Sequence, residues 1–150
     1  MAVQLCFHLL RQRQMDKDQG KMKGHDDWIA SLCELSGNKL ISGSNDHKLK
    51  VWNISNDSLI PIKTLEGHDD NVYQVISLTK DIIAFGSVDQ TIKIWDTNKY
   101  KEIQTLQEDF DVYSLLKLKN KDEMVSVGKG EGVSFWNTVT FKNEHSVECL

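Results

Sequence analysis

A short segment occurs three times in this chain of 150 residues, at nearly constant spacing. Its copies cover residues 40–53, 83–96 and 124–137, and each copy ends in Trp-Asn or Trp-Asp. The tryptophans lie 43 and then 41 residues apart, and a Gly-His pair at 24–25 recurs 43 residues later at 67–68. Two independent markers that keep one register indicate a tandem repeat, which strongly limits the folds open to this chain.

The pattern within each copy predicts two β-strands joined by a tight turn. From Thr91 to Asp96, alternate positions form two sets, Thr-Lys-Trp and Ile-Ile-Asp, and this period of two is typical of a strand. Asp89 precedes this strand, and aspartate suits a turn because its carboxylate can bond nearby backbone amides. We therefore expect an all-β chain.

A unit of this length that opens with Gly-His and closes with Trp-Asp resembles the WD-repeat (WD40) family, whose unit is one blade of a β-propeller. The resemblance implies three four-stranded antiparallel blades, at 24–66, 67–107 and, in degenerate form, 108–150. Residues 1–23 would form a separate N-terminal segment or linker. The strands are expected at 28–34, 39–42, 48–52, 60–65, 72–77, 82–86, 91–95, 102–106, 112–118, 124–127, 133–136 and about 147–150.

Three blades do not close a propeller, which needs about four to eight. Two sheet faces would stay uncovered, and a soluble protein must cover such apolar surface. The chain is compatible with three explanations: it is a piece of a longer or truncated product, two copies associate into a six-bladed ring, or another protein supplies the missing blades.

Composition narrows the class of protein. Hydrophobic residues make up 39% and charged residues 27%, which is typical of a soluble globular chain. A net charge of −4 gives no electrostatic footprint for nucleic acid, no apolar run is long enough to span a membrane, and no cleaved signal peptide is expected. The scattered cysteines Cys6, Cys33 and Cys149 favour a reducing intracellular compartment, cytoplasmic or nuclear.

In WD-repeat blades, a histidine, a serine or threonine, a turn aspartate and a tryptophan commonly form a buried chain of hydrogen bonds. The resemblance implies such a structural tetrad in the first unit, made of His25, Ser42, Asp46 and Trp52. The second unit keeps three members, His68, Asp89 and Trp95. Phe85 stands at the serine position, so we expect the indole N–H of Trp95 to find another acceptor.

The third unit departs further from this pattern. It keeps Ser126 and Trp136, with Glu108-Asp109 in place of Gly-His and Gly130 in place of the turn aspartate. The tetrad of this unit and its local geometry are therefore in doubt.

Serine, histidine and aspartate together also suggest a hydrolase. However, the set recurs with the repeat, and no nucleophile elbow opens a helix. The histidines at 8, 25, 47, 68 and 145 lack metal-ligand spacing with cysteines, and the glycines of 128–132 precede a strand rather than a helix. We expect no catalytic residues, no metal, no cofactor and no enzymatic activity.

The loops that lead into the inner strands combine acidic and aromatic residues. The acidic ones are Asp26-Asp27, Asp69-Asp70, and Glu108-Asp109 with Asp111, and the neighbouring aromatics are Trp28, Tyr73 and Tyr113. The family commonly binds peptides on this face. The resemblance implies a partner-binding face of Trp28, Ala30, Asn45, Asn71, Tyr73, Val88, Asp111, Tyr113 and, less directly, Lys129.

Carboxylates beside aromatic rings suit a partner peptide with lysine or arginine. The simpler interpretation is that the paired aspartates only solvate their loops.

We expect a non-catalytic scaffold or adaptor that binds other proteins or peptides. The alternative is a substrate receptor of a ubiquitin ligase, although 52–55 and 95–98 lack the arginine often found after Trp-Asp and no F-box-like segment fits before Gly24. An enzyme is a distant third.

Overall fold

The computed structural model describes residues 24–55, 58–130 and 132–148. The N-terminal segment or linker expected at 1–23 lies outside the described residues. Within the described residues, the chain forms strands β1 to β12. The same residues contain no helix that is long and apolar enough to cross a membrane.

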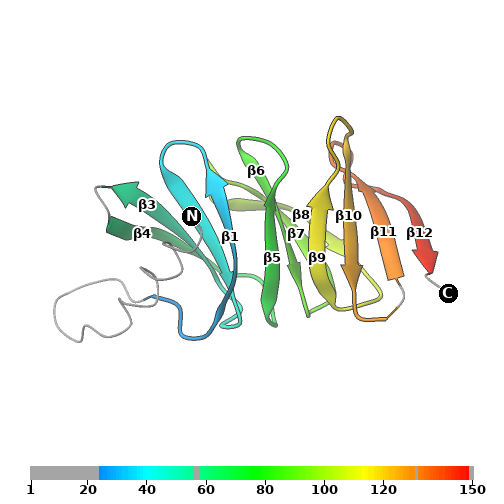
Figure 1. Ribbon diagram of the computed structural model, residues 1–150, viewed down its shortest axis with the longest axis horizontal. Coiled ribbons are helices and arrows are strands. Elements are labelled where there is room, and N and C mark those ends of the chain that lie inside the picture. The colour runs from blue at the N-terminus through cyan, green and yellow to red at the C-terminus, as the bar shows by residue number, and fades with distance from the viewer. Residues whose placement is uncertain (1–23, 56–57, 131, 149–150) are drawn as a thin grey trace.

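The strands form three four-stranded antiparallel sheets, which we call blades 1 to 3 (Figure 1). Blade 1 contains β1 (Ile29–Leu35), β2 (Lys39–Ser44), β3 (Leu49–Ser55) and β4 (Ser58–Leu65). Blade 2 contains β5 (Val72–Ser77), β6 (Ile82–Ser87), β7 (Thr91–Asp96) and β8 (Lys101–Gln107). Blade 3 contains β9 (Val112–Lys117), β10 (Glu123–Gly128), β11 (Gly132–Asn137) and β12 (Asn143–Glu148). The predicted all-β fold with incomplete propeller blades is confirmed, and the blades form an open row rather than a ring.

The last strand differs from the expectation. It was expected near 147–150, but β12 runs over Asn143–Glu148. A tight turn brings the chain back early: Phe141 has a φ of 55°, and its amide donates to the carbonyl of Asn137 at 3.0 Å. The side chain of Asn137 accepts from the amides of Val139 and Thr140 at 2.9 and 2.8 Å, which stabilises this turn.

Antiparallel pairing sorts the loops into two ends. The turns β2–β3, β6–β7 and β10–β11 and the connections β4–β5 and β8–β9 share one end, which we call the crossover end, at the bottom of Figure 1. The turns β1–β2, β5–β6 and β9–β10 lie at the opposite end. The inner strands β1, β5 and β9 pack side by side along the row.

Two of the three buried hydrophobic clusters lie between neighbouring blades, and the third consists of Leu40, Trp52 and Leu59 of blade 1. Ile41 and Val51 of blade 1 meet Val75, Ile83 and Phe85 of blade 2. On its other side, blade 2 packs against blade 3 through the residues Ala84, Ile92, Ile94, Leu106, Val112, Leu115, Met124 and Trp136. Full burial of one such side chain contributes about 1.5–3 kcal/mol.

Two glycines let the blades approach closely. A Cβ atom at Gly43 would lie 2.9 Å from Cγ1 of Val72, and one at Gly86 would lie 2.5 Å from Cγ1 of Val112. In both cases the valine at the start of the next inner strand occupies the space that a side chain would take. We call these positions glycine sockets.

Replacing Gly86 by Ala should therefore destabilise the fold by about 1–3 kcal/mol, because the added methyl overpacks the interface between blades 2 and 3. Urea denaturation monitored by tryptophan fluorescence measures this change. Gly24→Ala is the matched control, since a Cβ atom there meets nothing within 4 Å, and it should change stability by less than about 0.5 kcal/mol. Equal effects of the two substitutions would contradict the socket.

Candidate functional site

In blade 1, the tetrad residues lie within hydrogen-bond distance of one another. Nδ1 of His25 lies 2.9 Å from Oδ2 of Asp46, and Nε2 of His25 lies 2.6 Å from Oγ of Ser42. The indole of Trp52 donates to the same Oγ at 2.8 Å. With Nδ1 protonated, His25 donates to the carboxylate and accepts the serine hydroxyl, which satisfies all four side chains.

The tetrad fastens the loop before β1 to the β2–β3 hairpin. Asp46 also accepts from the backbone amides of Asp26 and Lys48, at 2.9 and 3.1 Å. Burial alone would raise the pKa of Asp46, but the hydrogen bonds from His25 and from these amides outweigh it and hold the pKa well below its usual range. Asp46 is therefore an anion at neutral pH.

This arrangement does not present a nucleophile, although it contains serine, histidine and aspartate. Ser42 is completely buried, and its hydroxyl already contacts His25 and Trp52. The scissile bond of a substrate could not reach that oxygen. The geometry is suited to holding a hairpin rather than to acyl transfer.

Blade 2 uses the same parts without the serine. His68 lies 2.7 Å from Oδ2 of Asp89, and Thr91 donates to Asp89 at 2.6 Å. Burial is again the largest influence and would raise the pKa of Asp89, but the hydrogen bonds from His68 and Thr91 lower it well below its usual range. The ring of Phe85 meets that of His68 edge-on, with centroids 6.5 Å apart.

The expectation that Trp95 finds another acceptor is wrong. Nε1 of Trp95 and Nε2 of His68 are both buried without a hydrogen-bond partner among the described residues. The completely buried side chain of Phe85 occupies the site where a hydroxyl would join them. Apolar packing between blades 1 and 2 has replaced a polar bridge.

In blade 3, a glutamate takes the place of the tetrad histidine, one residue before the position expected from the sequence. Glu108 is 5% exposed and takes the histidine position. Its Oε1 accepts from the hydroxyl of Ser126 and, at 2.7 Å, from the indole of Trp136, and its Oε2 accepts from Ser134 at 2.9 Å. The two tetrad members predicted for this unit contact each other, since the indole of Trp136 lies 3.1 Å from Oγ of Ser126. Glu108 replaces only the histidine, as a carboxylate that accepts three bonds.

The alignment of Glu108-Asp109 with Gly-His was therefore shifted by one residue. His68 lies four residues before Val72, and Glu108 lies four residues before Val112. Counting back from the tryptophan hides this match, because the β9–β10 hairpin is one residue longer than the β5–β6 hairpin. Counting from the first residue of the inner strand would have found it.

Equivalent backbone bonds hold the crossover end of all three blades. The amide of Asn45 donates to the carbonyl of Trp28 at 2.9 Å, and that of Val88 to Asn71 at 3.0 Å. The amide of Lys129 donates to Asp111 at 3.0 Å. Residues of the predicted partner-binding face are thus joined in pairs, one pair for each blade.

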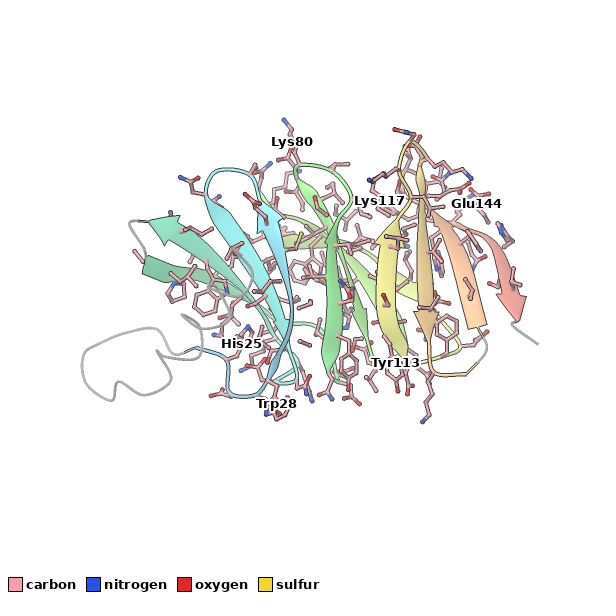
Figure 2. The ribbon with its side chains drawn as sticks, in the orientation of Figure 1. His25, Trp28, Lys80, Tyr113, Lys117 and Glu144 are labelled. Carbon is pink, nitrogen blue, oxygen red and sulfur yellow. The ribbon has the colours of Figure 1, made fainter. Side chains whose placement is uncertain are left out.

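The side chains of this face differ in exposure. Trp28 is 80% exposed and Tyr113 is 44% exposed, and both lie along the same end of the molecule (Figure 2). Tyr73 and Tyr113 meet edge to face, with centroids 5.3 Å apart. Ala30 is exposed, whereas Asn45, Asn71, Val88 and Asp111 are half-buried. The structure brings Tyr73 of blade 2 against Tyr113 of blade 3, whereas Trp28 of blade 1 makes no ring contact with them.

Carboxylates surround these aromatic residues. Asp26, Asp27, Asp69 and Asp109 are exposed, and Asp70 and Asp111 are half-buried. Backbone amides fix two of them: Trp28 donates to Asp27, and Asn71 donates to Asp70, each at 2.7 Å. Glu108, counted in this acidic group from sequence, is not part of it because it is buried beneath the loop.

Comparison with known proteins assigns the family. The model of the "WD domain, G-beta repeat" family matches residues 16–53 and 59–96, just over half of the chain. The chain belongs to the WD-repeat family. Members of this family bind other proteins and are generally non-catalytic. Blade 3 lies outside the matched residues but repeats the same four-stranded architecture.

One curated relative is similar over a short stretch. F-box/WD repeat-containing protein 7 of Drosophila melanogaster is 49% identical over 35 residues. These residues are 23% of this chain and 3% of that protein.

The described residues contain no group of three or more histidine, cysteine, aspartate or glutamate side chains that could hold a metal ion.

Replacing Phe85 by Ser should destabilise the protein less than Phe85→Ala. Both changes remove a buried ring at a cost of about 3–5 kcal/mol, but the serine hydroxyl can bridge His68 and Trp95 and recover about 0.5–1.5 kcal/mol per bond. Chemical denaturation of the two variants measures the difference. Ile83, which lacks such partners, is the control, and Ile83→Ser should destabilise the protein more than Ile83→Ala does. If serine were the more destabilising residue at both positions, the proposed bridge would be contradicted.

Acid should weaken the fold through Asp46 and Asp89. A carboxylate whose pKa is lowered by folding stabilises the native state above the unfolded pKa, about 3.9, and this contribution is lost as the pH falls below it. The free energy of unfolding should therefore decrease from pH 5 to pH 3. Asp46→Asn should lower stability at pH 7 and flatten this dependence, as followed by urea denaturation at several pH values. Asp109→Asn, at an exposed position, should leave the dependence unchanged.

Proposed function

We propose that this WD-repeat protein is a non-catalytic interaction scaffold that binds a basic peptide along its crossover end. The observation that carries the proposal is the set of aspartates and aromatic rings on three equivalent loops. Each loop is fixed by a backbone bond between the residue before the inner strand and the hairpin turn.

Charge favours a cationic partner at this end. Asp26, Asp27, Asp69, Asp70 and Asp109 are exposed or half-buried there. The lysines of these loops, Lys48 and Lys129, lie 3.8 and 3.9 Å from Glu66 and Asp111, respectively. A lysine- or arginine-bearing peptide would meet a negative surface, which increases its association rate and fixes its orientation.

The aromatic rings supply the apolar part of the proposed site. Trp28 presents most of its indole to solvent, and a cation over its face gains about 0.5–1 kcal/mol at such an exposed position. The Tyr73–Tyr113 pair forms a second, more rigid aromatic surface between blades 2 and 3. Because the loops are already held in place, binding would cost little ordering of the backbone.

A second candidate is a substrate receptor of a ubiquitin ligase. The similarity to an F-box/WD repeat-containing protein favours it, although that similarity spans only 35 residues. Affinity purification followed by mass spectrometry separates the candidates: ligase subunits among the partners would support the receptor, and their consistent absence would support a scaffold.

We further propose an intracellular setting, cytoplasmic or nuclear, on the basis of the scattered cysteines.

The basic-peptide site is tested with the double substitution Asp69→Lys and Asp70→Lys. Binding of a fluorescein-labelled lysine-rich peptide should weaken about tenfold at low salt, because two attractive charges become repulsive. Fluorescence anisotropy measures the affinity. Trp28→Ala should weaken binding further without lowering stability, since Trp28 is 80% exposed.

The matched control places the same charge change at the opposite end, as Asp122→Lys with Glu123→Lys. This variant has the same net charge as the first one. It should bind the peptide almost as the wild type does. An equal loss in both double variants would show a non-specific effect of net charge, and no loss in either would contradict the site.

A further inference from the structure

One outer face of the row of blades is buried although none of the described blades covers it. Ile41 and Val51 of blade 1 face blade 2, so the alternating side chains of Leu40 and Trp52 point to the other side, where Leu59 joins them. We call Leu40, Trp52 and Leu59 the end face. Leu40 is 8% exposed, and Trp52 and Leu59 are each 4% exposed. Blade 1 stands at one end of the row, so none of the other described strands lies on this side (Figure 1).

The end face repeats a surface that blade 2 buries against its neighbour. Leu40 pairs with Trp52 across β2 and β3, as Ile83 pairs with Trp95 across β6 and β7. Ile83 and Trp95 belong to the cluster between blades 1 and 2. The end face is therefore built like a surface that packs against another segment of protein.

The opposite end of the row shows a face without such a cover. Leu115 and Met124 of blade 3 face blade 2, whereas Leu116 and Val147 lie on the other side of the sheet. Leu116 is 61% exposed and Val147 is 47% exposed. Neither end of the row has a further blade among the described residues, yet only the end face of blade 1 is buried.

His25 accounts for only part of this burial. Its imidazole bonds Ser42, and its ring centroid lies 6.2 Å from that of Trp52. His25 sits at the crossover end of the blade, whereas Leu40 and Leu59 are each the second residue of their strands and lie toward the opposite end. Another segment is needed to cover those two side chains.

The sequence before blade 1 contains a segment suited to this face. Residues 3–9 read Val-Gln-Leu-Cys-Phe-His-Leu, so a large apolar residue stands at every second position. This period of two gives an extended segment one continuous apolar side. Residues 10–23 then lead to Gly24 beside His25. A chain of that length reaches up to about 45 Å when extended, whereas the seven-residue strand β3 is about 23 Å long.

We propose that residues 3–9, which lie outside the described residues, cover the end face as an extended cap. The apolar side of the segment would meet Leu40, Trp52 and Leu59, and its other side would face water. A further blade, from a second copy or from another protein, could then join the row at blade 1 only by displacing the cap. The inference concerns the end face alone and is independent of the peptide site at the crossover end.

Charges on the apolar side of the segment test the cap. The parent is the full chain with Trp28→Phe, which removes the exposed indole and leaves the buried Trp52, Trp95 and Trp136. In this parent, Leu5→Asp with Phe7→Asp should release the segment and increase the quenching of tryptophan fluorescence by acrylamide. The unfolding equilibrium constant from urea denaturation should rise at least about tenfold, because the burial of two large apolar side chains is lost. Circular dichroism verifies that the variant is folded.

The matched control is Gln4→Asp with His8→Asp, which at pH 8 adds the same two charges to the other side of the segment. It should leave the quenching unchanged and the unfolding constant within about threefold of the parent. If the first variant does not fold, the same two pairs of positions are compared as alanine substitutions. An equal response of the two sides would overturn the proposal. So would a parent chain that has the mass of two chains by light scattering and whose quenching increases on dilution, because a second copy would then cover the end face.

Discussion

Burial of apolar sheet faces between neighbouring blades is the interaction on which the rest of this structure depends. A single four-stranded blade has two faces and almost no interior, so Ile41, Ile83 and Ile94 become buried only when another blade covers them. Small residues at the contact matter as much as large ones. Val72 and Val112 reach the preceding sheet because Gly43 and Gly86 carry no side chain there.

The three blades solve one polar problem in three ways. Blade 1 joins histidine, serine and tryptophan by hydrogen bonds. Blade 2 fills the serine site with Phe85, and two of its buried nitrogens have no hydrogen-bond partner in the part of the chain that the structure describes. Blade 3 replaces the histidine with Glu108, which accepts three bonds. In all three blades the loop before the inner strand is held against the hairpin: His25 and His68 bond the turn aspartates of blades 1 and 2, and the carboxylate of Glu108 bonds Ser126 and Ser134 of blade 3.

The aspartates of these loops fall into an inward-bonded group and an exposed group. Asp46 and Asp89, whose pKa values are lowered, bond the histidines and backbone amides of the loops. Asp26, Asp69 and Asp109 are exposed on the loops before the inner strands of blades 1, 2 and 3, and Asp26 lies two residues before the exposed Trp28. A scaffold of this kind can vary its outer loop residues while its internal hydrogen bonds keep the loops in place.

Much of the fold was readable from the sequence, because strand period, turn residues and repeat spacing are local properties. These predicted an all-β chain of repeated units, and the resemblance to the WD-repeat family implied the three blades and the tetrad of blade 1. Position 108 was misjudged because one extra residue in the β9–β10 hairpin shifts the count from Trp136, and β12 was placed too late because the turn after Asn137 is tight. The sequence by itself determined the class of fold, the repeat and the residues of most strands. Only the tertiary structure decided that Glu108 is an internal acceptor and that the indole N–H of Trp95 has no hydrogen-bond partner among the described residues, because both depend on contacts between strands far apart in the chain.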